Sequence, residues 1–587
     1  MEIRRIFDLL PYMEANHPKK LDVLAGKANG KWTLYSLHDY IENVTNISYG
    51  LLELGIRKGD TVATICNNRP EWNFIDMATM MIGAVHVPIY PTISDEDIAY
   101  ILNHAEVKAI FVGDEHYTKI ERLLPRSCCL EHLYLFSTDK GAKSIEELIT
   151  LGKTHPQPVM LEEMKSAVTG DQMATLIYTS GTTGNPKGVM LTHTNLISNF
   201  IAVSPIPKMG SEARGISFLP LSHVYERVIN YIYQYLGVSI YYVENMATIT
   251  DNMKEISPDI ICAVPRFIEK VYDKIVATGR KQKGFKKNIF FWALNLGHKY
   301  EFDNSNGLWY DLQLKIANIL VFSKWRAALG NKLQLIVSGG AALQPRLSRV
   351  FWAAGIGVHE GYGLTETSPV ISVQTREKGG VKLGTVGPVL YNVTVKIAED
   401  QEILCKGPNV MAGYYKAPEM TAEVIDEDGW FHTGDLGILD NDGHLSIVGR
   451  KKEIFKTSMG KYIHPVKIEN MMKESSFIDN ILVVGENQKY AAALVAPFFE
   501  HLRSWCRIKN IPYTSDDQMV RDQTIKKRFM KEVDKFNSCL GATEQVKKIE
   551  LMESEWTIPT GELTPSLKLR RNFMTNKYKE LIDKMFE

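Results

Sequence analysis

A loop of hydroxyl residues and glycines that ends in a single lysine carries the strongest chemical signal in the sequence. It lies within residues 178–193, which read YTSGTTGNPKGVMLTH and follow an apolar run, residues 174–177, that predicts a β-strand. Hydroxyls and backbone N–H groups without bulky side chains suit a loop that wraps a polyphosphate, and glycines let the backbone approach closely. Lys187 can place a positive charge on a phosphate oxygen. The loop is therefore predicted to bind phosphate groups.

The loop differs from the phosphate-binding loop of P-loop ATPases. That motif requires G-x-x-x-x-G-K followed by Ser or Thr, whereas Gly181 and Gly184 stand three apart and Pro186 precedes Lys187. We therefore expect a different nucleotide chemistry. The alternative interpretation is a flexible surface linker. The strand expected before the loop and the helical spacing expected from Asn195 disfavour it.

Two further segments of glycine and polar residues follow predicted strands. Leu333 to Val337 precedes Ser338-Gly339-Gly340-Ala341, and residues 357–359 precede Glu360-Gly361-Tyr362-Gly363-Leu364-Thr365-Glu366. Ligands of open α/β sheets bind beyond the carboxyl ends of the strands, so the three loops are predicted to meet at one ligand. Glu366 could hold a magnesium ion together with phosphate oxygens, and Tyr362 could stack on a purine.

Length and composition narrow the class of protein. The chain has 587 residues, 45% of them apolar, with 68 basic and 68 acidic side chains, which predicts a large globular protein of more than one domain. The balanced charge argues against a nucleic-acid partner. Seven scattered cysteines without metal-ligand spacing predict reduced thiols. We find no apolar signal sequence, and the longest apolar stretch, residues 228–243, is short and split by Gly237. We therefore expect a cytoplasmic protein that could contact a membrane peripherally.

The order of predicted elements indicates an α/β architecture. Strands and helices alternate over residues 30–113, which favours a largely parallel sheet. From about residue 384, short strands with glycine turns predict an antiparallel β-rich subdomain, and residues 455–587 mix strands with amphipathic helices.

Several features of the sequence each allow two interpretations. Asp435 could be a structural turn residue or a ligand-binding group, and Lys568 could serve only solubility. The basic cluster at residues 280–287 could be a solvated face or could attract an anionic membrane. The aromatic stretch at residues 231–242 could line an acyl tunnel, although packing between a helix and a strand is favoured.

Taken together, the segments resemble the adenylate-forming superfamily of acyl-CoA synthetases, adenylation domains and luciferases, and most of all its long-chain fatty-acid:CoA ligases. The resemblance covers nearly the whole chain, and the motifs occur in the order typical of that superfamily. They are residues 178–193, Gly339-Gly340-Ala341, Gly361-Tyr362-Gly363-Leu364-Thr365-Glu366, Thr433-Gly434-Asp435, Gly449-Arg450 and Lys568. The likeness to the ligases rests on residues 68–72, 88–92, 219–227, 264–266 and 563–569.

The resemblance implies a reaction in two steps: a fatty-acid carboxylate attacks ATP to give acyl-AMP and pyrophosphate, and CoA then takes the acyl group. The catalytic residues that it implies are Lys568, Thr365, Glu366 and His223. Thr179 and Glu366 are implied to place Mg²⁺. The implied nucleotide-binding and cofactor-binding residues are Thr179, Ser180, Gly181, Thr182, Thr183, Gly184, Lys187, Gly339, Gly340, Ala341, Glu360, Gly361, Tyr362, Gly363, Asp435, Arg450 and Lys452.

The resemblance also implies a domain plan. A large N-terminal α/β domain, residues 1–448 with a β-rich subdomain at about 384–448, is followed by a hinge at 449–454 and a small mobile α+β domain at 455–587. Lys452 matches the pivot of the hinge. One departure is Arg227, which stands where some members of the family carry a gating Trp. The resemblance therefore does not predict which acyl chain length this protein selects.

Two other functions are weighed beside the CoA ligase. An enzyme that loads acyl groups onto a carrier protein often has an extra block near the hinge, and none is found between Arg450 and Pro465. A non-catalytic binder could have lost the charged motif residues without losing the fold, yet Lys187, Glu366, Asp435, Arg450 and Lys568 are all present.

Overall fold

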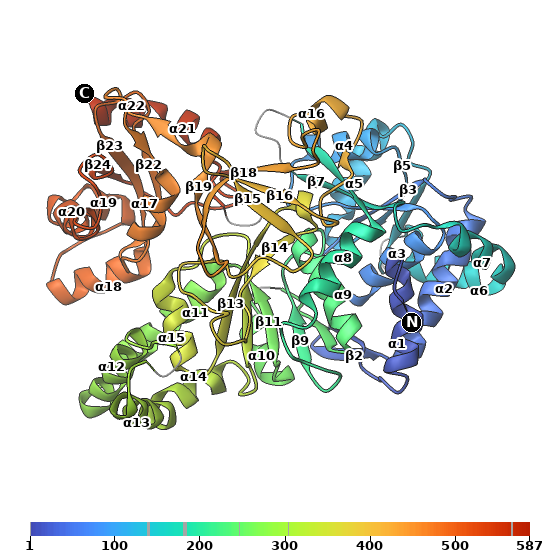
Figure 1. The fold of residues 1–587 in the computed structure, drawn as a ribbon, viewed down its shortest axis with the longest axis horizontal. Helices are drawn as coiled ribbons and strands as arrows, with labels where there is room; N and C mark the ends of the chain where they lie inside the picture. Colours follow the sequence, from blue (N-terminus) through green and yellow to red (C-terminus); the bar gives the residue numbers. More distant parts are fainter. Residues whose placement is uncertain (1, 138–140, 180–184, 246, 303–304, 565–567) are drawn as a thin grey trace.

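Two large, mainly parallel β-sheets form the N-terminal domain, with helices between them and on their outer faces (Figure 1). The computed structural model describes residues 2–137, 141–179, 185–245, 247–302, 305–564 and 568–587. The seven-stranded sheet has the order β17 (Gly413–Tyr414), β8 (Lys187–Thr192), β7 (Met173–Thr179), β4 (Val85–Pro88), β3 (Thr61–Ile65), β5 (Val107–Val112), β6 (His132–Leu135). The eight-stranded sheet has the order β14 (Val370–Val373), β13 (Gly357–Gly363), β12 (Leu335–Ser338), β11 (Ile260–Ala263), β9 (Arg214–Ser217), β10 (Ser239–Tyr242), β1 (Leu24–Ala28), β2 (Lys31–Tyr35).

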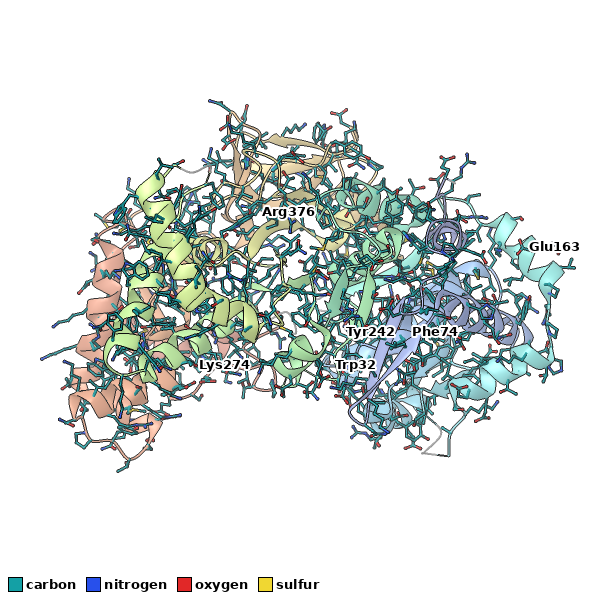
Figure 2. All side chains as sticks on the ribbon, turned by 90° about the horizontal axis from the view of Figure 1, so that it is seen from below. Trp32, Phe74, Glu163, Tyr242, Lys274 and Arg376 are labelled. Atoms are coloured by element: carbon teal, nitrogen blue, oxygen red, sulfur yellow. The ribbon has the colours of Figure 1, made fainter. Side chains whose placement is uncertain are left out.

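The largest apolar core lies between these two sheets. It joins Ile177 of β7 and Ile240 of β10 to Phe200 and Tyr231 on the helices between them, and it contains Phe74 and Tyr242, which Figure 2 labels. Burying a large apolar side chain stabilises the fold by about 1.5–3 kcal/mol. The helices of this half are α1 (Leu9–Asn16), α2 (Leu37–Glu53), α3 (Pro70–Met81), α4 (Asp95–His104), α5 (Tyr117–Leu123), α6 (Ile145–Thr154), α7 (Pro158–Ala167), α8 (His193–Val203) and α9 (Val224–Leu236).

A second core covers the other face of the eight-stranded sheet. Phe267 of α11 and Phe351 of α15 pack there against Ile261 and Ile336 of the central strands. The helices of this layer form the lower left part of Figure 1. They are α10 (Ile249–Ile256), α11 (Pro265–Lys281), α12 (Gly284–His298), α13 (Leu308–Ala317), the π-helical turn η4 (Asn318–Phe322), α14 (Ser323–Ala328) and α15 (Pro345–Ala353).

Helix boundaries follow the local signals in the sequence. α3 begins with Pro70, whose missing N–H costs nothing at a helix start. The Ser94 hydroxyl caps α4 by accepting from the Asp97 N–H at 3.1 Å. α9 ends at Gly237, which adopts φ +71°. The apolar stretch at residues 228–243 is therefore a helix followed by strand β10, as the sequence predicted.

An antiparallel sheet of four strands follows, as expected for the β-rich subdomain. The segment is not continuous, however, because β17 leaves it and pairs with β8 of the seven-stranded sheet. Short helix α16 (Pro418–Ala422) follows β17. The four strands are β15 (Thr394–Ile397), β16 (Glu402–Lys406), β18 (Phe431–Leu439) and β19 (Leu445–Arg450).

The smaller C-terminal domain has a three-stranded sheet with a separate apolar core on each face. Side chains alternate along β22, so Ile481 and Val483 enter one core, while Leu482 and Val484 enter the other. Its strands are β20 (Phe455–Lys456), β21 (Tyr462–Ile463), β22 (Ile478–Val484), β23 (Ala491–Pro497) and β24 (Val546–Leu551). Its helices are α17 (Pro465–Met472), α18 (Phe499–Lys509), α19 (Asp516–Arg521), α20 (Gln523–Asn537), α21 (Arg571–Lys577) and α22 (Lys579–Phe586).

The fold bears on two expectations from the sequence, which concern the state of the cysteines and the presence of a membrane-spanning helix. All seven cysteines are free thiols. None of the helices in the described ranges combines the length and the hydropathy that a bilayer crossing requires.

Candidate active site

Asp435 lies between an arginine and a tyrosine from two different sheets. It faces Arg450 across the β18–β19 pair, and its Oδ1 accepts a hydrogen bond from Nε of Arg450 at 2.8 Å. Its Oδ2 accepts another from the hydroxyl of Tyr362, also at 2.8 Å. Burial and then the Asp435 carboxylate raise the pKa of Tyr362 well above 10.0, so the phenol stays protonated and donates. The structure thus joins three of the predicted site residues.

The ends of β12 and β13 supply the next predicted residues. Gly340 and Ala341 are exposed just beyond β12, and β13 carries Glu360, Gly361 and Tyr362. A Cβ on Gly363 would lie 1.7 Å from the carbonyl oxygen of Pro369, so only glycine fits there. β12 and β13 are parallel neighbours paired up to Ser338 and Glu360, so these two segments leave adjacent strands, and the meeting of all three loops at one ligand stays a prediction.

Glu360 is a buried carboxyl group with spare hydrogen-bonding capacity. Its Oε2 accepts from the Leu343 N–H at 3.3 Å, whereas Oε1 has no partner among the described residues. Burial raises the pKa of Glu360 to about 8, so it is largely protonated at neutral pH. A protonated carboxyl with a free oxygen is able both to donate and to accept, as recognition of a base requires.

Glu366 lies beside a tyrosine that sequence reasoning missed. Oε1 of Glu366 accepts a hydrogen bond from the hydroxyl of Tyr414 at 2.9 Å, and Nζ of Lys187 lies 5.1 Å from the centre of the Tyr414 ring. The N–H of Met411 donates to the Glu366 carbonyl at 2.8 Å and holds the backbone of β17 alongside. The only local signal for Tyr414 was an aromatic pair after Gly413 in a turn-rich stretch.

The predicted phosphate loop joins two antiparallel strands. Thr179 ends β7 and pairs with Lys187, which begins β8. The expected strand before the loop is confirmed, and helix α8 begins at His193, two residues before Asn195, from which helical spacing was expected. Strand β8, which lies between the loop and this helix, was not predicted from the sequence. Ser180, Gly181, Thr182, Thr183 and Gly184 lie outside the described residues.

Lys568 brings the C-terminal domain to this site. The backbone N–H of Lys568 donates to the Thr564 hydroxyl at 3.0 Å. The side chain retains contact with solvent, but desolvation by surrounding protein lowers its pKa, as does the charge of Arg450. Asp435, Glu453 and Glu366 act in the opposite direction and favour the charged form. Electrostatic interactions therefore link Lys568 of the C-terminal domain with Glu366, Asp435 and Arg450 of the N-terminal domain.

His223 is a neutral residue on the same side of the molecule. It caps α9, where its Nδ1 accepts from the Tyr225 N–H at 3.1 Å. Burial, and then the charge of Lys568, lower the pKa of His223 to about 4. The imidazole is therefore uncharged at neutral pH and cannot serve there as a cation.

Among the predicted residues, Lys452 lies apart from these contacts. It is exposed in the short turn η6 (Lys451–Glu453), and no described residue forms an ion pair with it. Its neighbour Lys451, by contrast, forms an ion pair with Glu402 at 2.9 Å. Residues 451–454 connect β19 to β20 and thus link the two domains.

The candidate metal-binding residues suit a magnesium ion that is also coordinated by a ligand, rather than one coordinated by protein groups alone. Glu366 has a carboxylate with one hydrogen bond from Tyr414, and Thr179 is half-buried at the end of β7. No group of three or more His, Cys, Asp or Glu side chains gathers in the part of the chain that the structure describes. Magnesium usually binds one or two carboxylates together with phosphate oxygens and water, so these residues fit it.

Arg227 has a structural role that the sequence did not predict. It is fully buried and forms an ion pair with Asp76 and a hydrogen bond to the Tyr231 hydroxyl at 2.7 Å. Nδ1 of His86 lies 2.7 Å from Oδ1 of the same Asp76. Tyr231, too, is enclosed in this network, so it belongs to the core, as favoured from the sequence. A buried charge needs such partners.

Three further contacts, none of which involves Lys568, also join the two domains. Arg266 at the start of α11 forms an ion pair with Asp479 of β22, and Nε2 of Gln344 donates to the Lys473 carbonyl at 3.2 Å. Nη1 of Arg280 lies 2.7 Å from Nδ1 of His501 on α18. These contacts hold the C-terminal domain against the N-terminal domain.

Family models match this combination of motifs over most of the chain. The model described as "AMP-binding enzyme" matches residues 14–415, and the model described as "AMP-binding enzyme C-terminal domain" matches residues 452–587. The chain belongs to the AMP-binding enzyme family. The part that the first model covers ends beside β17, and the second begins at Lys452.

Curated relatives within this family align with this chain over most of their length. A long-chain-fatty-acid–CoA ligase of Mycobacterium bovis is 32% identical over 566 residues, 95% of this chain and 93% of the relative. A peroxisomal long-chain acyl-CoA synthetase of Arabidopsis thaliana is 32% identical over 574 residues, 92% of this chain and 80% of the relative.

Solved structures have the same adenylate-forming fold. The adenylation domain of a carboxylate reductase from Mycobacterium chelonae superposes with a TM-score of 0.77 at 19% identity, covering 99% of this chain and 91% of the other. This likeness supports the expected architecture of a large α/β domain and a smaller C-terminal domain.

Proposed function

We propose that this AMP-binding enzyme is an acid–thiol ligase that activates a long-chain fatty acid with ATP and transfers the acyl group to CoA. The convergence of Lys568 with Glu366, Asp435 and Arg450 carries the proposal, because it gathers groups of both domains around one site. The long-chain-fatty-acid–CoA ligases at 32% identity support the choice of substrates.

In the first proposed step, a carboxylate oxygen of the fatty acid bonds to the α-phosphorus of ATP, and pyrophosphate leaves. Both reactants are anionic, so a cation between them offsets their repulsion. Lys568 is the proposed cation, with Thr365 beside the α-phosphate. Preorganised donors of this kind often contribute about 3–4 kcal/mol to the transition state.

The remaining residues are proposed to hold the nucleotide. Asp435 would accept hydrogen bonds from the ribose hydroxyls while Arg450 fixes its orientation, and Glu360 and Tyr362 would face the base. Thr179 and Lys187 would contact the phosphates, together with the predicted loop between them. Magnesium, held by Glu366 and Thr179, would neutralise phosphate charge when bound.

In the second proposed step, the thiol sulfur of CoA bonds to the acyl carbon, AMP leaves and the thiol proton passes to solvent. Lys568 lies among the nucleotide-binding residues, so this step requires the C-terminal domain to move. We propose a hinge at residues 449–454 with Lys452 as pivot, between a domain at 1–448 and one at 455–587. The exposure of Lys452 supports this role, because a pivot must change its backbone angles freely.

Transfer to a carrier protein is the less favoured alternative. The curated relatives at 32% identity are named CoA ligases or acyl-CoA synthetases. The reductase domain from M. chelonae, at 19% identity, supports the fold only.

Substrate-dependent turnover tests the proposal. Acids from acetate to stearate, oleate and an aromatic acid are supplied with ATP, with and without CoA, and pyrophosphate and AMP are both measured. AMP and acyl-CoA formed only with long acids would support the ligase. Pyrophosphate release that CoA does not accelerate, with acyl-AMP accumulating, would support a carrier-protein loader. No product with any acid would refute the proposal.

Peripheral contact with a membrane is a further part of the proposal, because a long-chain acid partitions into bilayers.

A further inference from the structure

The segment formed by α13 and η4 is apolar on two opposite faces, and only one of them packs against the protein. Its inner face buries Tyr310, Ala317, Val321 and Phe322 in the core of the eight-stranded sheet. Its outer face leaves large apolar side chains in solvent at helical spacing. The outer face consists of Leu308, Trp309, Leu312, Ile316, Ile319 and Leu320, of which Leu308 is 88% exposed and Trp309 72%.

Such a surface differs from the scattered apolar residues of ordinary protein surfaces. The outer face places six large apolar side chains next to one another on one continuous helical segment. Contiguous exposed patches of this kind mark interaction sites, because water contact with apolar area is unfavourable. The side chains do not contribute to the core, so their apolar character is explained by a partner.

Five exposed lysines lie on, or at the start of, helices that form or adjoin the layer with the outer face. Lys315 is exposed on α13 and Lys324 on α14, the helix that follows η4, while Lys283, Lys286 and Lys287 flank the exposed Phe285 at the start of α12. α12 packs on both α13 and η4, and α14 follows η4 directly. None of these five lysines forms an ion pair with a described residue. We refer to these five lysines as the lysine rim.

The outer face lies on a projecting part of the molecule. Figure 1 shows α12 and α13 at the lower left edge, outside the sheets. In Figure 2, Lys274 on the neighbouring helix α11 is far from Glu163 on α7 at the opposite end. α12 packs against α11 and α15, which follow strands β11 and β12 of the eight-stranded sheet. A partner on this edge would not need to displace either domain.

We propose that the outer face and the lysine rim dock the protein on the surface of an anionic phospholipid bilayer. Apolar side chains with a tryptophan enter the boundary between headgroups and acyl chains, while lysines stay at the level of the phosphates. The charge favours this partner over a second copy, since a twofold dimer through this face would bring two lysine rims together.

Vesicle flotation with the full-length protein tests the proposal without requiring turnover, so its failure is distinct from failure of the proposed reaction. The protein is mixed with vesicles of phosphatidylcholine, or with vesicles containing about one-third phosphatidylglycerol. We expect it to float with the anionic vesicles and to be released by salt. The combined change Leu308→Ser, Trp309→Ser and Ile319→Ser should weaken binding about tenfold or more. Combined Lys283→Gln, Lys286→Gln and Lys287→Gln should act similarly, but only on anionic vesicles.

Matched variants separate docking from general changes in surface chemistry. Ile319 and Ile508 are both 74% exposed, so Ile319→Ser should weaken flotation while Ile508→Ser on α18 should not. The control for the lysine rim is the combined change Lys527→Gln, Lys547→Gln and Lys584→Gln, at exposed positions of the C-terminal domain. Circular dichroism and ATP–pyrophosphate exchange without vesicles verify that each variant is folded.

Three results would overturn the proposal. The first is that the wild-type protein does not float with anionic vesicles. The second is that the outer-face variant floats as well as the wild type. The third is that the wild type is a dimer and the outer-face variant a monomer, while both bind vesicles equally. Brominated lipids provide a direct supporting measurement. They should quench tryptophan fluorescence of the wild type more than that of Trp309→Phe.

Discussion

The hydroxyl of Tyr414 donates a hydrogen bond of 2.9 Å to Oε1 of Glu366, from a strand that has crossed from the β-rich segment to the seven-stranded sheet. The same ring lies 5.1 Å from Nζ of Lys187. Tyr414 thus links the proposed magnesium ligand to the proposed phosphate lysine. We propose that it is a positioning residue, which acts by fixing the orientation of the Glu366 carboxylate.

Tyr414→Phe is expected to raise the Mg²⁺ concentration needed for half-maximal AMP formation, because Glu366 loses the bond that orients it. A hydrogen bond to a charged group contributes about 1.5–3 kcal/mol, which corresponds to an effect of about tenfold or more. Initial rates are measured against Mg²⁺ at saturating ATP. Tyr415→Phe removes the hydroxyl of the adjacent residue and is the control. An unchanged Mg²⁺ dependence in Tyr414→Phe would refute the positioning role.

Lys568→Ala is expected to abolish adenylation but to leave thioester formation from supplied acyl-AMP nearly intact. The lysine offsets charge repulsion only while the carboxylate attacks ATP, so the rate of the first half-reaction should fall about a hundredfold or more. ATP–pyrophosphate exchange measures the first half-reaction, and acyl-CoA formation from acyl-AMP measures the second. Lys584→Ala, at an exposed position of the same domain, is the control. Equal loss of both half-reactions would contradict the assignment.

Asp479→Asn is expected to weaken the arrangement of the two domains that the structure shows, because Arg266 loses its charged partner in β22. Adenylation depends on Lys568 reaching the nucleotide, so exchange should slow by about fivefold or more, while transfer from supplied acyl-AMP is spared. Asp516→Asn breaks the Arg503 ion pair within the C-terminal domain and should leave both half-reactions unchanged. If the two variants behave alike, the interdomain pair has no such role.

Glu226→Gln is expected to increase stability at alkaline pH. Glu226 is fully buried on α9, and burial raises its pKa from 4.5 to about 8. Between these values the folded state binds a proton that the unfolded state lacks, so this group's contribution is complete below pH 4.5 and is lost as the pH rises through about 8. One pKa unit corresponds to about 1.4 kcal/mol, so the expected change is a few kcal/mol.

The melting temperature of Glu226→Gln should therefore exceed that of the wild type at about pH 9 and approach it at about pH 5, since glutamine does not ionise. Glu146→Gln, at an exposed position of α6, is the control. A constant difference between Glu226→Gln and the wild type at every pH would show that the carboxyl does not titrate in this range.

The sequence by itself determined the local elements and the positions of the motifs. Pro70, Ser94 and Gly237 mark helix ends because the chemistry of caps and turns acts over only a few residues. The short apolar runs at residues 481–484 and 491–495 likewise predicted strands β22 and β23. Glycine-rich segments after strands predicted the place of the site, because parallel strands end at a common edge.

Only the tertiary structure decided which distant side chains meet. The bond between Tyr414 and Glu366 depends on β17 joining a different sheet, and the Arg266–Asp479 pair depends on how the two domains face each other. Arg227 matched a gating position by sequence, yet packing closes it into a network with Asp76. Such pairings result from strand order and the packing of several elements together, and no signal within a short stretch of sequence encodes them.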